Sequence, residues 1–305
     1  MPLRLEVVPE KAVVVRREKS IVAASWFGPT VLRPFIYPFL GPFDLEMTRL
    51  GHPLDPVAHS HHRSLWIGHN DVSGINFWEE SVGCGRIEQT DLNLGTAAGN
   101  EVSFSLECDW KSPAGKILLK EARKLTFQDL GGELALELDT LLKPAEKDKP
   151  VVFGDTPFGL LGIRVARTIR VAEGLGGLIL NSQDAENEAG CHWQHADWCD
   201  YSGPVPWEGP PKDPAQKEGE VKKQPDAITL PGVVVGIACF NHHENSPTDT
   251  LWHVRDDGWM GPCISKGEAR TVPVEGLRAR YRIEAHRGRP WDAEIGEKYR
   301  KWRRK

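Results

Sequence analysis

The segment from 57 to 80 concentrates side chains that could do chemistry. Four of the chain's 11 histidines, His59, His61, His62 and His69, lie within 11 residues of it. An imidazole can take up and release a proton near neutral pH, and as a neutral ring it is a common metal ligand. His59 and His61 are two residues apart, so in an extended segment both rings would project to the same side and could share one cation. The spacing therefore predicts an acid–base site or a divalent-metal site, with a hydrogen-bonded structural corner as the third interpretation.

Further polar groups that could hold a polyhydroxylated ligand lie in the same segment and in three later blocks. Guanidinium and carboxylate groups form paired hydrogen bonds with polar ligands, and aromatic rings stack on the C–H faces of a sugar. Each block also permits a structural interpretation, such as an Asp–Arg pair closing a hairpin, a Trp-rich core loop or a solvated sheet face. The candidates are Arg63 and Asp71 in the first segment, Asp155 and Arg164 in "FGDTPFGLLGIRV", Asp197, Trp198 and Asp200 in "ADWCDYSG", and His253 and Arg255 in "LWHVR".

The strands that must position these groups are indicated by alternating hydrophobicity. Residues 102–110 place their apolar side chains on one face, and residues 122–140 predict a hairpin whose turn contains two glycines. Residues 162–171 and 277–286 alternate in the same way, which predicts a strand in each segment. Residues 232–240 form a continuous apolar run, which is typical of a central strand buried on both faces.

Helical periodicity is best developed at the C-terminal end, in residues 289–305. There Pro290 occupies a first-turn position, and Ile295, Tyr299 and Trp302 are spaced to share one helix face. The basic residues that follow suit the negative end of a helix dipole. This pattern predicts one short C-terminal helix.

Many strands separated by turn signals, with hardly any helix, predict an all-β fold. The expected architecture is a large antiparallel β-sandwich, with residues 1–305 as a single domain. One segment, 208–226, is rich in Pro, Lys and Glu. Because strand patterns resume on both sides of it, we expect an exposed charged loop rather than a domain boundary.

Composition disfavours several function classes. The formal charge of −5 argues against a nucleic-acid or anionic-membrane surface, and no apolar run approaches the roughly 18 residues of a membrane-spanning helix. The N-terminus lacks the apolar centre of a secretory signal, and the six cysteines show no CxxC spacing. We therefore expect a cytoplasmic chain with free thiols. P-loop, nucleophile-elbow and HExxH motifs are absent, which disfavours nucleotide enzymes, serine hydrolases and zincin proteases.

Five blocks resemble, in order, those of the family labelled methane oxygenase PmoA-like. They are "RPFIYPFLGP", "HSHHRSLWIGHNDVSGINFW", "FGDTPFGLLGIRV", "ADWCDYSGP" and "LWHVRDDG", and they span roughly 33 to 258. The family name refers to a copper enzyme that is embedded in a membrane, whereas this sequence has no spanning segment, so we treat the name as a misnomer. The resemblance implies a bacterial protein with a galactose-mutarotase-like β-sandwich, and sugars or sugar derivatives as substrates.

Residues and resemblance together predict a carbohydrate-active enzyme: an epimerase or mutarotase, or a lyase or hydrolase acting on a sugar or keto-sugar derivative. In this hypothesis His61 or His62 shares acid–base work with Asp155 or His253 in a concave cleft of the sandwich. The other candidates would bind and orient the substrate. These are Arg63, His69, Asp71, Arg164, Asp197, Trp198, Asp200 and Arg255.

Two alternatives stay open. In the first, a divalent metal held by His59, His61 and a third ligand takes part in the reaction; the sequence requires no other cofactor. In the second, the same sandwich is a non-catalytic sugar-binding or scaffold protein, which would bind a ligand without changing it. In either case the expected partner is a small molecule, a sugar derivative, rather than nucleic acid or a membrane. The sequence predicts no oligomeric state.

Overall fold

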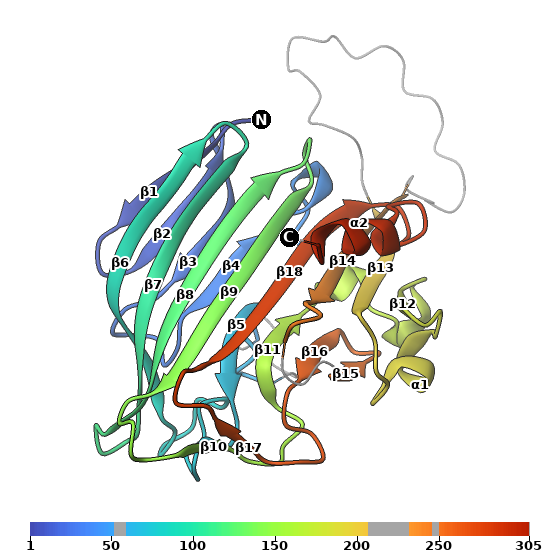
Figure 1. Ribbon diagram of the computed structural model, residues 1–305. Helices are drawn as coiled ribbons and strands as arrows, with labels where there is room; N and C mark the ends of the chain where they lie inside the picture. Colours follow the sequence, from blue (N-terminus) through green and yellow to red (C-terminus); the bar gives the residue numbers. More distant parts are fainter. Residues whose placement is uncertain (52–58, 207–231, 246–249, 305) are drawn as a thin grey trace, which may run out of the picture.

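Two large antiparallel sheets dominate the fold. The computed structural model describes residues 1–51, 59–206, 232–245 and 250–304. Within them, two eight-stranded sheets form the two layers of a sandwich, and a short helix lies near the C-terminus (Figure 1). This confirms the predicted all-β class. The predicted charged loop at 208–226 lies outside the described residues.

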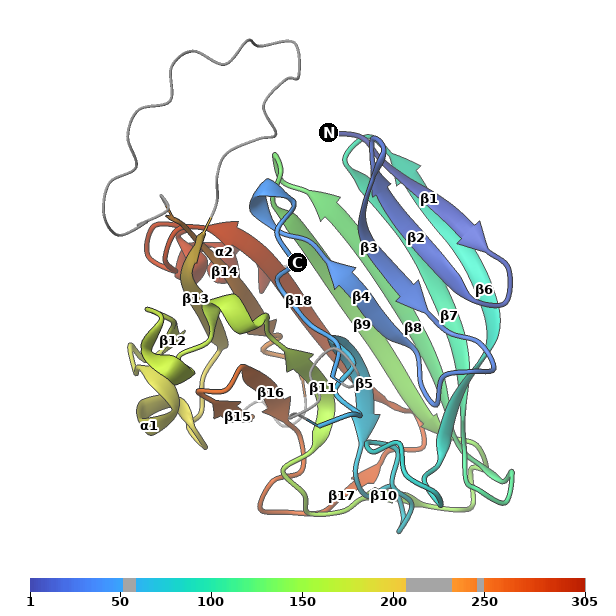
Figure 2. The ribbon, with the colours of Figure 1, turned by 180° about the vertical axis from the view of Figure 1, so that it is seen from behind.

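The first sheet has the strand order β1–β2–β3–β4–β5–β11–β16–β15. Its strands are β1 (Leu3–Val8), β2 (Ala12–Arg17), β3 (Ser20–Trp26), β4 (Phe35–Phe39), β5 (Leu65–His69), β11 (Gly159–Arg164), β16 (Trp259–Cys263) and β15 (Leu251–Arg255). The second half of this sheet brings together strands from three distant parts of the sequence. Figure 2 shows β5, β11, β16 and β15 side by side.

The second sheet has the order β12–β13–β14–β18–β9–β8–β7–β6. Its strands are β12 (Leu178–Asn181), β13 (Trp198–Pro206), β14 (Gly232–Asn241), β18 (Leu277–Arg287), β9 (Leu134–Pro144), β8 (Ile117–Asp129), β7 (Glu101–Lys111) and β6 (Arg86–Ala98). A small sheet pairs β10 (Val151–Phe153) with β17 (Arg270–Val272). The helices are α1 (Asn187–Cys191) and α2 (Ile295–Trp302), and three 3-10 turns occupy Pro42–Asp44, Arg167–Ile169 and Ala172–Gly174.

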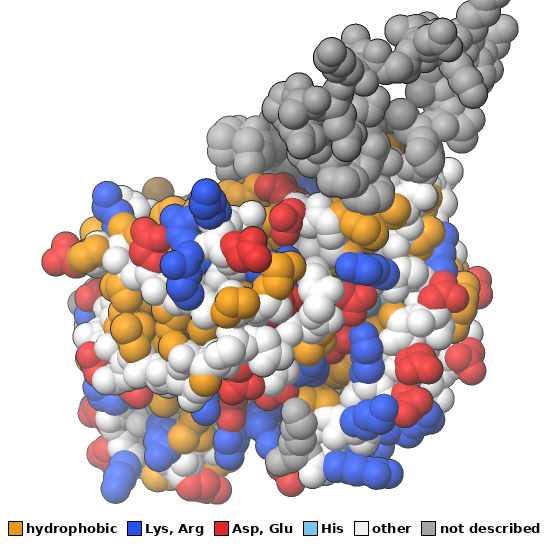
Figure 3. Space-filling model, turned by 90° about the horizontal axis from the view of Figure 1, so that it is seen from above, with side chains coloured by type: hydrophobic (Ala, Val, Ile, Leu, Met, Phe, Trp, Pro, Cys, Tyr) orange, Lys and Arg blue, Asp and Glu red, His pale blue; other side chains and the backbone are white. Residues whose placement is uncertain are grey.

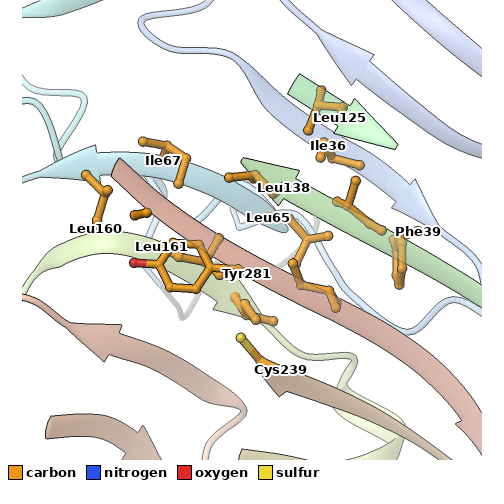
Figure 4. Packing of buried hydrophobic residues seen from close by; sticks show 14 of the residues in the cluster. Ile36, Phe39, Leu65, Ile67, Leu125, Leu138, Leu160, Leu161, Cys239 and Tyr281 are labelled. Atoms are coloured by element: carbon orange, nitrogen blue, oxygen red, sulfur yellow. The ribbon is translucent and has the colours of Figure 1, made fainter. Parts of the chain in front are cut away.

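The main core lies between the two sheets. Leu65 and Ile67 of β5 lie in this layer together with Leu125 of β8 and Leu138 of β9 (Figure 4). Burying each such side chain contributes about 1.5–3 kcal/mol. On β7 the alternate side chains are buried, as their period of two predicted: Val102, Phe104, Leu106, Cys108 and Trp110.

Three further strand predictions are confirmed. The hairpin at 122–140 is formed by β8 and β9, and its turn is closed by the Leu130 amide, which donates to the Glu133 carbonyl at 2.8 Å. The apolar run at 232–240 is β14, which lies inside the second sheet between β13 and β18. The alternating segment at 277–286 is β18.

Two predictions are corrected in their bounds. The alternation at 162–171 does not produce one strand, because β11 ends at Arg164 and the chain then turns into the 3-10 helix Arg167–Ile169. The C-terminal helix begins at Ile295, later than the proline suggested, because Glu294 takes a left-handed conformation with φ 53°. Pro290 precedes the helix instead of starting it.

Helix α2 covers the outer face of the second sheet. Its three predicted apolar residues, Ile295, Tyr299 and Trp302, are buried against Trp198 and Phe240. No helix in the described part of the chain combines the length and the apolar character needed to cross a membrane.

Charges of both signs are mixed on the surface, and the thiols are free. Lys and Arg side chains are interspersed with Asp and Glu on the face shown in Figure 3. All six cysteines are free thiols, as their spacing predicted, and five of them are buried. For four of these five, burial holds the pKa of the thiol well above its usual range: Cys108, Cys199, Cys239 and Cys263.

Candidate active site

A pocket of about 360 Å³ lies on the face of the first sheet that points away from the core. The sheet supplies its floor, the turn before β5 and the loop after it supply one wall, and α1 supplies a residue at the opposite rim. The lining residues are His59, His61, His62, Trp78, Glu79, Phe158, Arg164, Glu188, His253, Arg255, Asp257 and Trp259.

Strand alternation explains which side chains reach the pocket. On β15, Trp252 and Val254 are fully buried in the core, so His253 and Arg255 face the opposite way and line the pocket. The alternation of "LWHVR" therefore separates two core residues from two pocket residues. On β5, Trp66 likewise points away from the core and joins a separate aromatic cluster with Trp78 and Trp259.

This aromatic cluster forms the apolar part of the site. The ring centroids of Trp66 and Trp259 are 5.6 Å apart, as are those of Trp78 and Trp259. The indole nitrogens of all three rings are buried without a hydrogen-bond partner among the described residues. A buried N–H that lacks a partner costs roughly 1–3 kcal/mol, so these three groups together make the cluster a candidate for contact with a polar ligand.

Three histidines form one wall because the backbone folds them together. The His62 amide donates to the His59 carbonyl at 3.1 Å, which closes a tight turn, and the Gly51 amide donates to the His62 carbonyl at 2.7 Å. Arg33 fixes the turn from the protein side by donating to the His61 carbonyl at 2.5 Å. As a result the three imidazole centroids lie 4.6–5.4 Å from one another.

Burial keeps the inner imidazoles neutral. Loss of solvent, together with the nearby Arg33 charge, lowers the pKa of His61 to about 4. The pKa of His62 is lowered further, again mainly by burial. The His62 ring packs against both Trp66 and Trp259 at centroid distances of 5.3 and 5.1 Å, and its Nδ1 is buried without a partner among the described residues.

Two ion pairs hold charged groups at fixed positions in the pocket. Arg164 donates two parallel bonds to Asp257, at 2.9 and 3.1 Å. Burial alone would raise the pKa of Asp257, but the bonds and charge of Arg164 outweigh it and hold that pKa below its usual range. At the opposite rim, Arg255 donates to Glu188 at 2.5 Å. The other carboxylate oxygen of Glu188 accepts the Asp256 amide at 3.0 Å.

His253 has the geometry of an acid–base group. Its Nδ1 lies 3.3 Å from the Pro157 carbonyl oxygen. Because a carbonyl can only accept, this contact assigns the proton to Nδ1 and leaves a lone pair on Nε2. The side chain is 6% exposed, and burial, followed by the His192 and Arg255 charges, lowers its pKa to about 4.

The structure brings together five of the residues predicted for chemistry or for substrate binding: His61, His62, Arg164, His253 and Arg255. His59, predicted as a metal ligand, joins them. The other predicted residues are absent from the pocket lining, and most of them have structural partners.

His69 and Asp71 belong to a satisfied corner. The ring of His69 is fully buried; its Nε2 lies 2.8 Å from the Ser265 hydroxyl, and its Nδ1 accepts the Asp71 amide at 3.1 Å. The Asp71 carboxylate accepts the Gly74 amide at 2.8 Å and so caps a turn. Asp155, predicted as an acid–base residue, is exposed and accepts the Gly267 amide at 2.8 Å.

Arg63 and Asp200 are held by ion pairs elsewhere. Arg63 forms a two-pronged bond with Glu80, at 3.0 and 2.5 Å. Asp200 lies 2.6 Å from the ring of His286, and both side chains are fully buried. Burial disfavours the charged ring, but the Asp200 charge outweighs it and raises the pKa of His286.

Trp198 and Asp197 lie at the second sheet. Trp198 packs under α2 in the cluster on the outer face of that sheet. Asp197, the residue before it, is exposed. Neither lines the pocket.

Six lining residues were missed as site candidates in the sequence. Asp257 follows the predicted strand that carries Arg255, but its partner is Arg164 on β11, which is 93 residues away. Glu188 lies on α1, a helix that no periodicity indicated. The other four have no signal of their own, because an aromatic or acidic residue in a loop is common; they are Trp78, Glu79, Phe158 and Trp259.

Comparison with known proteins gives a family match and distant structural likenesses. The model of a family described as "Family of unknown function (DUF6807)" matches residues 28–300. No curated protein matches the sequence. Among solved structures, a galactose mutarotase related enzyme from Lactobacillus acidophilus is similar at 10% sequence identity and a TM-score of 0.35, over 93% of this chain and 97% of that chain.

Proposed function

The chain belongs to the family of unknown function DUF6807, and we propose that it is a carbohydrate-active enzyme that transfers protons on a sugar or keto-sugar derivative. The observation that carries the proposal is the position of His253, whose Nε2 forms no hydrogen bond with a described residue, in a pocket that also holds two ion pairs and an aromatic wall. Epimerisation, ring opening and elimination all begin or end with such a proton transfer. The PmoA-like resemblance is not needed for this proposal.

Size and lining suit a small polar ligand. The pocket volume of about 360 Å³ falls within the range of roughly 300–1,000 Å³ that small-molecule sites occupy. Trp259 offers a ring face for the C–H side of a sugar, and the ion-paired Arg164 and Arg255 offer N–H donors for its hydroxyl or carboxylate oxygens. Because each guanidinium is already held by a carboxylate, binding the ligand orders few additional side chains.

The proposed proton transfer uses the neutral form of His253. At neutral pH the ring is unprotonated at Nε2, because its pKa is about 4, and can take a proton from a carbon next to a carbonyl or from a ring hydroxyl. The imidazolium that forms keeps its Nδ1–H bond to Pro157. With so low a pKa it is a strong general acid, which favours return of the proton to the product.

Proton NMR in D₂O tests this proposal on pools of candidate substrates. Aldoses, keto-sugars and uronates are incubated with wild-type protein and with His253→Gln, and loss or exchange of C–H signals is followed. We expect turnover of at least one compound in the wild type and a loss of roughly 100-fold or more in the variant, the usual effect of removing a general base. His243→Gln, which changes an exposed histidine outside the pocket, is the matched control.

The results of this experiment distinguish an enzyme from a non-catalytic sugar-binding protein. Equal rates in the wild type and in His253→Gln would exclude His253 as the acid–base group. Saturable binding of a sugar with no chemical change over long incubation would favour the non-catalytic sugar-binding protein instead.

A further inference from the structure

We infer that His59, His61 and His62 form a site for one divalent transition-metal ion of the Zn²⁺ class, with an open coordination position toward the pocket. One ring nitrogen of each residue lies within 4.8 Å of the corresponding nitrogen of the other two. The sequence indicated only the pair His59 and His61; the tight turn adds His62 as the third ligand.

The spacing lies within reach of a loaded site. With metal–nitrogen bonds of about 2.0–2.1 Å in tetrahedral geometry, two ligand nitrogens lie roughly 3.3–3.4 Å apart. A pair at the upper limit of 4.8 Å would therefore have to close by up to roughly 1.5 Å. His59 is exposed, so its ring can make this adjustment by rotating, while the buried His62 ring is held by packing against two tryptophans.

The three rings have no other hydrogen-bonding role among the described residues. The buried histidines elsewhere, His69, His242, His253 and His286, each have a ring nitrogen in a hydrogen bond. His62 is equally buried, at 5% exposed, yet its Nδ1 has no partner, and neither His59 nor His61 has a ring hydrogen bond within the described part of the chain. Backbone bonds alone hold the turn, so the lone pairs are left for a ligand.

The charges around the cluster predict what completes the coordination. Arg164 is neutralised by Asp257, and Arg33 lies 3.5 Å from Glu80. A bound ion would therefore add positive charge to a nearly balanced pocket, in which Glu79 is a lining carboxylate that forms no ion pair with any described residue. An anionic oxygen of the substrate, such as an enediolate or a carboxylate, suits the open position; this step rests on the proposed function.

The ligand set selects the class of ion. Three imidazole ligands with no thiolate favour Zn²⁺, Co²⁺, Ni²⁺, Cu²⁺ or Fe²⁺. Mg²⁺ and Ca²⁺ prefer sets of oxygen ligands, so they should bind poorly here. Three protein ligands and one open position are also the arrangement of catalytic rather than structural zinc sites.

Metal titration tests the inference without any substrate. Full-length protein is stripped with a chelator, dialysed and titrated with Co²⁺ by absorption and with Zn²⁺ by calorimetry. We expect one ion per chain, with affinity reduced tenfold or more in His59→Ala and His61→Ala and lost in His62→Gln. His243→Ala, which removes an exposed histidine outside the cluster, should bind within twofold of the wild type, and Mg²⁺ should not compete.

Folding of each variant is checked by circular dichroism. If His62→Gln does not fold, His59→Ala and His61→Ala carry the test, because their rings are less buried. Absence of saturable binding in the wild type, or unchanged affinity in both of those variants, would overturn the inference. Metal binding without sugar turnover would support the metal site and contradict the proposed function. Sugar turnover without metal binding would support the proposed function and contradict the metal site.

Discussion

Two regions of this molecule differ in whether their buried polar groups have hydrogen-bond partners among the described residues. On β8, Glu121 is fully buried and accepts bonds from Arg123 at 2.7 and 2.9 Å, from Trp110 at 2.8 Å and from the Thr140 hydroxyl at 2.7 Å. Around the pocket on the first sheet, ring and guanidinium nitrogens are equally buried but lack partners among the described residues. These are His62 Nδ1, Arg164 Nε and the Nε1 atoms of Trp66, Trp78 and Trp259.

The two regions therefore differ in whether the described residues themselves satisfy their buried polar groups. In a network whose members are all hydrogen-bonded, such as the one around Glu121, the low dielectric of the interior strengthens each interaction. A buried polar group that lacks a partner lowers the stability of the folded state, and a functional site is one place where such a group is retained. The same contrast divides the histidine-rich stretch itself: His69 has both ring nitrogens bonded, whereas His62 does not.

The largest predicted effect on stability comes from removing the negative charge of Glu121 from its hydrogen-bonded network. Glu121→Gln leaves the Arg123 charge buried without its counter-ion, so we expect a loss of about 3–5 kcal/mol in the free energy of unfolding. Urea unfolding followed by tryptophan fluorescence measures it. Glu188→Gln, which weakens a partly exposed pair at the pocket rim, should change stability by at most about 1 kcal/mol. Equal losses in the two variants would remove the distinction between the regions.

The pH dependence of stability tests the satisfied corner at His69. Burial lowers the pKa of His69 from 6.5 to about 4. Between these values the unfolded chain carries a proton on this residue that the folded chain does not. Stability should therefore fall as the pH is lowered from 6.5 toward 4, and His69 alone accounts for roughly 3 kcal/mol.

The slope of unfolding free energy against pH checks this expectation. His69→Gln removes the titrating group, so its slope between pH ~6.5 and ~4.5 should be shallower than that of the wild type. A variant with an undiminished slope would show that His69 is not buried in its neutral form.

A smaller effect compares two indole N–H groups directly. Trp110→Phe leaves the Glu121 carboxylate one donor short, so we expect a loss of about 1–3 kcal/mol beyond the packing change. In Trp259→Phe the lost N–H has no partner among the described residues, so removing it should raise stability by roughly 1–3 kcal/mol beyond the packing change, because that N–H is buried at a cost in the wild type. Thermal denaturation of both variants gives the difference, and a larger loss in Trp259→Phe would contradict the comparison.

Local pattern was enough to predict much of the fold. Alternation at 102–110 and 277–286 and the apolar run at 232–240 identify β7, β18 and β14, because one-sided or two-sided burial of a strand leaves a direct mark on its sequence. The alternation at 162–171 wrongly predicted one strand over the whole segment, because the chain leaves the sheet after Arg164 although apolar residues continue.

The site was predicted only in part, for a different physical reason. His61, His62 and His253 could be proposed from residue type and spacing. Whether a polar residue faces a ligand or another side chain depends on long-range pairing: Asp200 meets His286 across 86 residues, and Asp257 meets Arg164 across 93. No local pattern encodes such pairs, so Asp200 was expected in the pocket and Asp257 was not.

The unsatisfied region around the pocket, and not the closed network at Glu121, is where we expect a ligand to bind. Indole N–H signals in a ¹H–¹⁵N correlation spectrum report on both regions at once, after assignment with Trp→Phe variants. On addition of a saturating sugar found in the NMR screen, we expect the signals of Trp78 and Trp259, which line the pocket, to shift while that of Trp110 stays in place. A shift confined to Trp110, or unchanged Trp78 and Trp259 signals at saturation, would contradict this expectation.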